Sequence, residues 1–262
     1  MAASIQLELQ RAIRLNNEAT REIHNNGNYD SAIKLLASAL ALSRQAILEK
    51  PDKEQMLEEG SIFGQHSNIS LDQCILLAQQ GQPPLKLDSD NGNYLNHHLL
   101  PSEGQGQGQG PSFVFQSPIA IPEHFMDNAD QMYVSSIAVS VMIIFNLALA
   151  HQLSGMATSI SSMKVASLRK AVKLYELSFH LLREEQMDEG TTVFSMATIN
   201  NSGVIYYSLG DAATSGRCFE HVLSTLMFLI DCGDGDRVSR LEGLFQNTSY
   251  LIFPHEATAA AA

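Results

Sequence analysis

The chain has 262 residues, of which 45% are hydrophobic and 17% are charged. With 28 acidic against 16 basic residues it carries a formal charge of -12. Nucleic-acid phosphate and anionic membranes repel such a chain at long range, so we expect no nucleic-acid partner. The 3 cysteines form no CxxC pair, which predicts free thiols. The N-terminus lacks the apolar core of a secretory signal, so we expect a cytoplasmic or nuclear protein.

Residues 1–52 predict an N-terminal helical hairpin. Apolar residues recur at helical spacing over 5–15 and again over 29–43. Between these stretches, Gly27 suits the left-handed residue that ends a helix, and Asn28 is a good cap for the next one. The two stretches are therefore expected to pack as one hairpin.

Residues 53–128 differ in composition from the helical segments on either side and are interpreted as a low-complexity insertion. The insertion is rich in Gly, Pro, Gln and Asn. We expect 86–111 to be disordered, because such a composition buries too little apolar surface to offset its ordering entropy. Two short apolar runs, Cys74–Ala78 and Phe113–Phe115, predict a short strand pair. Leu71–Gln79 also fits a short helix, and both interpretations stay open.

Helical periodicity returns over 129–253, before an alanine-rich tail at 254–262. Helices are expected at 129–153, 164–185, 191–209, 212–231 and 236–252. The mean hydropathy of Met132–Ala150 reaches the range of transmembrane helices. We favour a fully buried helix, because serines and Asn146 interrupt the apolar run and no cation flanks it closely. A membrane-anchored adaptor is the alternative.

One spacing recurs in three segments, at about 14–45, 141–183 and 196–229. A small residue in a first helix is followed by a turn, and then by a small and a bulky residue in a second helix. This spacing resembles the 34-residue tetratricopeptide repeat (TPR). The matching positions are Gly27, Tyr29, Ala32, Leu36, Ala148, Ala171, Tyr175, Gly203, Tyr206, Gly210 and Phe219. We expect them to be packing residues, the small ones allowing helices to approach closely.

The TPR resemblance implies an all-α fold, an α-α superhelix of stacked antiparallel hairpins interrupted by the insertion. In the middle segment Ala171 follows Ala148 by 23 positions, whereas Ser215 follows Gly203 by 12. We interpret residues 155–165 or their neighbourhood as an 11-residue expansion of the turn. Tryptophan is absent, a departure from the repeat consensus. The motifs FNLALAH, KLYELS, INNSG and CFEHVLSTLMFL are also similar to an uncharacterised TPR-like family expanded in diatoms.

No sequence pattern points to catalysis, a cofactor or a metal site. The chain has no phosphate loop, no HExxH and no GxSxG. The Asp-rich stretches 88–99 and 231–242 place Gly or Leu at positions where a calcium loop needs ligands. His180 and Glu184 have helical spacing but no third ligand. We expect a non-catalytic protein.

A binding surface is what the TPR resemblance implies instead. In that fold the first helices of the hairpins line a concave groove, and the positions facing it here are Arg14, Asn17, Arg21, His24, Met142, Phe145, Leu149, Gln152, Asn200, Val204 and Tyr207. Its largely apolar, amide-bearing lining suits a helix or an extended peptide. We predict an interaction scaffold with a protein or peptide partner. The alternative is a structural or oligomerising protein whose own insertion fills the groove.

Overall fold

The computed structural model describes residues 2–48, 71–78, 111, 113–122, 132–184, 191–233, 241, 243–245 and 247–248. These residues are mostly helical and include no β-strand, which confirms the predicted all-α class. The helices are α1 (Ala2–Arg21), the π-helical turn η1 (Glu22–Asn26), α2 (Tyr29–Leu48), α4 (Leu71–Ala78), α5 (Met132–Ala157), α6 (Ser161–Glu184), α7 (Thr192–Ser208) and α8 (Ala212–Asp231). Most of the predicted disorder at 86–111 and the predicted tail at 254–262 lie outside the described residues. Pro111, the last residue of the predicted disorder, is described and buried.

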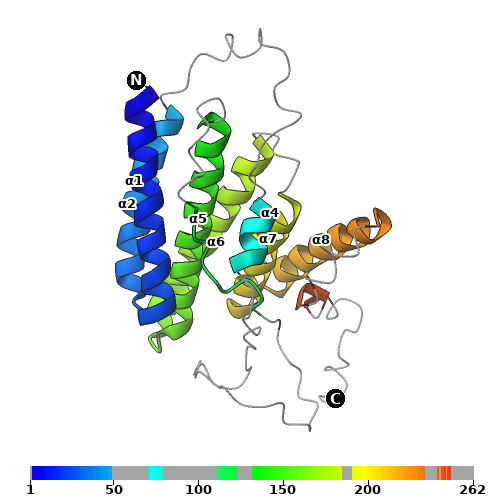
Figure 1. Cartoon of the computed structure of the whole chain (residues 1–262). Coiled ribbons are helices and arrows are strands. Elements are labelled where there is room, and N and C mark those ends of the chain that lie inside the picture. The colour runs from blue at the N-terminus through cyan, green and yellow to red at the C-terminus, as the bar shows by residue number, and fades with distance from the viewer. Residues whose placement is uncertain are drawn as a thin grey trace, which may run out of the picture.

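The long helices follow one another as three hairpins, α1/α2, α5/α6 and α7/α8 (Figure 1). Consecutive hairpins are in contact, because α2 packs against α5 and α6 packs against α7. The first hairpin therefore lies directly on the second, although the insertion separates the two in the sequence.

Glycines and caps form the turns of the first and third hairpins. Gly27 and Gly210 have φ of 57° and 81°, the left-handed conformation that glycine adopts without strain. The Oδ1 of Asn28 accepts a hydrogen bond from the Ser31 N–H at 3.3 Å, so Asn28 caps α2 as predicted. The Oδ1 of Asp211 accepts one from the Thr214 N–H at 3.0 Å and caps α8 in the same way.

The predicted expansion of the turn in the second hairpin is wrong. α5 continues to Ala157 and α6 begins at Ser161, so the extra residues lengthen both helices, to 26 and 24 residues. Gly155 lies inside α5, where an added Cβ would stand 3.2 Å from atoms of Leu168 and Ser167. This glycine therefore serves the close approach of α5 and α6 and does not end the helix.

The predicted strand pair is also wrong, because Cys74–Ala78 is part of the helix α4. Leu71 and Ile75 are buried, while Cys74 and Ala78 are half-buried. These four positions follow the i, i+3, i+4, i+7 spacing that places residues on one side of a helix. The helical alternative for Leu71–Gln79 is the one that the structure has.

Helix α5 is the centre of the core. It packs against α1, α2 and α6, and every residue from 136 to 150 is buried. Among the described residues, the stretch Ser136–Ala157 is long and apolar enough to cross a membrane, and 89% of its apolar window is buried inside the protein. Burial on all sides is what an apolar core helix requires.

Candidate functional site

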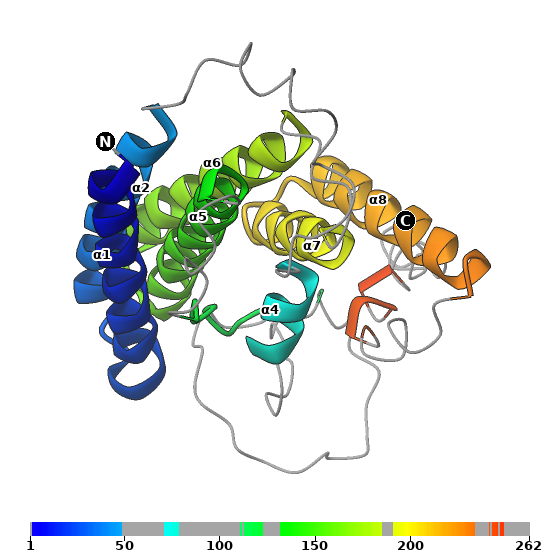
Figure 2. The same cartoon turned by 45° about the horizontal axis from the view of Figure 1, so that its top comes forward.

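Residues 113–122, which we call the covering segment, lie across the first helices of the three hairpins (Figure 2). Phe113, Phe115, Ser117, Ile119 and Ile121 are each at most 2% exposed. The intervening Gln116 and Pro118 are buried as well, and only positions 120 and 122 face solvent. Burial therefore alternates only over 119–122, as in an extended chain with one side against a protein surface, whereas 115–119 are buried on all sides. The insertion thus contributes an ordered, buried stretch to the core.

Two asparagines each hold one residue of the covering segment by both of its backbone polar groups. Asn146 of α5 accepts from the Ile119 N–H at 2.7 Å and donates to the Ile119 carbonyl at 2.8 Å. Asn17 of α1 accepts from the Ile121 N–H at 2.8 Å and donates to the Ile121 carbonyl at 2.7 Å. A side-chain amide offers the same donor and acceptor as a neighbouring strand. These contacts recognise an extended backbone, whatever its side chains are.

A third amide, Asn16, links the first two hairpins at the same place. Its Nδ2 donates to the Ile119 carbonyl at 3.0 Å, and its Oδ1 accepts from the Nδ2 of Asn146 at 2.8 Å. The Ile119 carbonyl therefore accepts two hydrogen bonds, one from α1 and one from α5. All three residues are at most 1% exposed, so no water competes for these bonds.

The other end of the covering segment is held by α7. The Nδ2 of Asn201 donates to the Phe115 carbonyl at 2.9 Å and to the Tyr175 hydroxyl at 3.0 Å. That hydroxyl donates in turn to the Oε1 of Gln152 at 2.9 Å. Complete burial raises the pKa of Tyr175 and keeps its proton in place for this bond. The chain of bonds fixes the orientation of the Asn201 amide.

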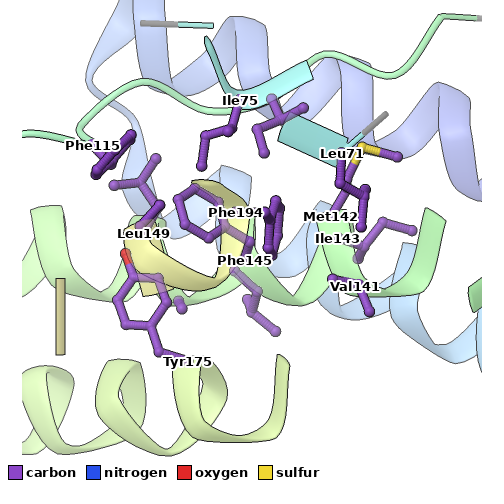
Figure 3. Packing of buried hydrophobic residues seen from close by; sticks show 14 of the residues in the cluster. Leu71, Ile75, Phe115, Val141, Met142, Ile143, Phe145, Leu149, Tyr175 and Phe194 are labelled. Atoms are coloured by element: carbon purple, nitrogen blue, oxygen red, sulfur yellow. The ribbon is translucent and has the colours of Figure 1, made fainter. Parts of the chain in front are cut away.

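Apolar contacts surround the amides. Figure 3 shows Leu71 and Ile75 of α4 over Phe145 and Phe194, which belong to α5 and α7. The ring centroids of Phe145 and Phe194 lie 5.2 Å apart. We call the side of α1, α5 and α7 that carries α4 and the covering segment the covered face. Apolar packing and amide hydrogen bonds hold its two covers in place.

The predicted groove residues fall into two groups. The buried ones are Asn17 in part, and Met142, Phe145, Leu149, Gln152, Asn200 and Val204 in full. Among them Asn17 binds the covering segment, and Asn200 accepts from the Nδ2 of Asn247 at 2.7 Å. The exposed ones are Arg14, Arg21, His24 and Tyr207.

Sequence reasoning missed Asn16, Asn146 and Asn201. Their side chains make hydrogen bonds to the backbone of Ile119 and Phe115 in the covering segment. A signal was present in the sequence. Asparagine doublets at 16–17 and 200–201 each lie about ten positions before the glycine of a hairpin turn, Gly27 and Gly210. A further asparagine, Asn146, lies in the long and largely apolar helix α5. Buried amides need hydrogen-bond partners, which here are backbone groups of a distant segment.

Titratable groups give no second candidate site. In the part of the chain that the structure describes, no three His, Cys, Asp or Glu side chains are grouped so that they could hold a metal ion. Burial, and then the charge of Lys170, lower the pKa of His151. Burial, and then the carboxylate of Glu176, raise the pKa of Cys218 to about 11, so its thiol is a poor nucleophile at neutral pH.

Comparison of the chain with protein-family models, with curated proteins and with solved structures finds no match.

Proposed function

We propose that this protein is a non-catalytic interaction scaffold that binds an extended segment of a partner protein on the covered face. The observation that carries the proposal is the pairing of Asn146 with Ile119 and of Asn17 with Ile121 through both backbone groups. The covering segment then occupies the site as an internal ligand. A partner segment of similar chemistry would replace the covering segment and form the same backbone hydrogen bonds with the asparagines, as in other recognition of extended peptides.

The TPR-like character of the fold is part of this proposal. Its support lies in small residues at the helix contacts: Ala32, Ala148 and Ala171 are fully buried, and an added Cβ on Gly203 would lie 3.0 Å from the Cβ of Cys218. In a TPR-like stack the first helices of the hairpins form the ligand-binding side. Here α1, α5 and α7 are those helices, and they supply the four asparagines.

The apolar positions of the covering segment define the partner that the face would accept. Ile119 and Ile121 point inward at alternate positions, and prolines stand at 118 and 122. Proline favours extended backbone in the residue before it. We therefore expect partners with aliphatic residues two positions apart, next to proline.

A purely structural protein is the second candidate. It is favoured by the complete burial of Phe113, Ile119 and Ser117, each 0% exposed. In this case the covering segment never leaves and no partner enters. The two candidates differ in one measurable property, exchange of the covering segment for another peptide.

A peptide-exchange experiment on the full-length chain separates the candidates. The double substitution Ile119→Asp with Ile121→Asp weakens the internal ligand, since each change puts a carboxylate where an aliphatic side chain is buried. A fluorescent peptide with the sequence of residues 111–124 is then expected to bind the variant and to raise its Tm. It should bind the wild-type chain at least about tenfold more weakly, because the tethered segment competes at high effective concentration.

Two controls accompany this measurement. Ala120→Asp introduces one carboxylate at an exposed position between the two isoleucines and should leave the wild-type behaviour unchanged. A peptide that carries both aspartates itself should not bind any of the chains. If the double variant keeps its helical circular dichroism but binds no wild-type peptide, the scaffold proposal is wrong and the structural role stands.

A further inference from the structure

Ser117 lies at the centre of the covering segment. It stands between Phe115, whose carbonyl is bound by Asn201, and Ile119, which is bound by Asn146. Its exposed fraction is 0%. Ser117 is followed by Pro118, and this is the only place in the sequence where proline follows a serine or threonine.

Among the helices that bind or cover this segment, only α1 carries cations, and its Arg11, Arg14 and Arg21 are exposed to solvent. Neither α5 nor α7 contains a lysine or an arginine, and α4, the other cover of this face, has none either. Within the part of the chain that the structure describes, a dianion on Ser117 would therefore enter a buried region to which α4, α5 and α7 supply no counter-charge. Burial of an unpaired charge is among the most unfavourable events in a protein interior.

We propose that Ser117 is a phosphorylation site for a proline-directed protein kinase, and that its phosphate expels the covering segment from the covered face. In the reaction, the Ser117 Oγ bonds to the γ-phosphorus of ATP as the bond from that phosphorus to the ADP oxygen breaks. The hydroxyl proton passes to a base of the kinase. The use of the freed face by a partner rests on the proposed function, whereas release of the segment does not.

The fold allows this release without unfolding. The covering segment belongs to no helix, and asparagine side chains of α1, α5 and α7 bind its backbone at Ile121, Ile119 and Phe115. When it leaves, the backbone hydrogen bonds of those helices stay intact. Segments held in this way open locally at a lower free energy than the whole fold. Transient opening is what exposes the Ser117 hydroxyl to a kinase.

Ser117→Glu and Ala120→Glu form a matched pair for the test in the full-length chain. Both add one carboxylate to the covering segment, the first at a buried position and the second at an exposed one. Hydrogen exchange followed by mass spectrometry should show amides 113–121 exchanging at least about 100-fold faster in Ser117→Glu, because the buried charge has no partner. Ala120→Glu and Ser117→Ala should exchange like the wild type. Equal exchange in the matched pair would overturn the proposal.

The wild-type chain gives a second, independent measurement in case Ser117→Glu does not fold. Incubation with ATP and a proline-directed kinase should place one phosphate on Ser117, detected by mass spectrometry, with helical circular dichroism retained and amides 113–121 exposed. No phosphate on the folded chain, under conditions that modify the peptide 111–124, would refute the site. Release of the segment without binding of added peptide would refute only the proposed function.

Discussion

Replacing Asn146 with alanine is expected to lower the free energy of unfolding by about 3 kcal/mol or more. The amide of Asn146 bonds both backbone groups of Ile119 and the Oδ1 of Asn16. Without this amide, the Ile119 N–H loses its hydrogen bond. Asn146, Asn16 and Ile119 are each 0% exposed, so water cannot replace the lost partner. A buried donor without a partner costs its full desolvation. Urea unfolding monitored by circular dichroism measures the change.

Asn17→Ala is the matched control for Asn146→Ala. Asn17 makes the same pair of bonds, to Ile121, but it is half-buried. Water can replace part of what is lost, so we expect a decrease of about 1 kcal/mol. If both substitutions have the same small effect, the buried amides do not anchor the covering segment.

Gly203→Val is expected to destabilise the chain by about 3 kcal/mol through overpacking. A Cβ on Gly203 would already stand 3.0 Å from the Cβ of Cys218 and 3.0 Å from the Cε1 of Phe219. The Cys218 Cβ is fixed to the backbone of α8, so the two helices would have to move apart. Thermal or urea unfolding of the purified variant gives the value.

Gly216→Val separates this steric effect from helix propensity. Gly216 is a glycine of α8, but nothing lies within 4 Å of a Cβ added there. Valine is a somewhat better helix former than glycine, so the change should stay within about 0.5 kcal/mol of the wild type. Comparable destabilisation by both substitutions would show that the contact of α7 with α8 does not depend on a small residue at 203.

The hairpins were predictable because their signals are local. The break between α1 and α2 depends on the left-handed Gly27 and the cap Asn28, which are adjacent in the sequence. The turn in the second hairpin was misplaced for a related reason. Repeat spacing gives the distance from Ala148 to Ala171 but does not say whether extra residues lengthen a turn or the helices. No proline marks the choice, and the serines and threonines over 154–162 offer several possible caps.

The covering segment could not be placed from the sequence because its partners are remote. Asn17 and Ile121 are separated by 104 positions, and Asn16 and Asn146 by 130. Composition correctly marked the insertion as different, but a short run such as 118–122 does not indicate which surface buries it. Filling by the insertion was one of two alternatives that the sequence left open. The serines and Asn146 of α5 were interpreted only as evidence against a membrane span.

Hydrogen exchange of the Ile119 backbone amide, resolved by NMR, tests most directly whether the covering segment is held on the covered face. Ile119 lies in no helix, yet its N–H is buried and bonded to Asn146. We predict that this amide exchanges as slowly as the core amides of α5 in the wild type and much faster in Asn146→Ala. Exchange of the wild-type amide at the rate of an unstructured peptide would contradict the account.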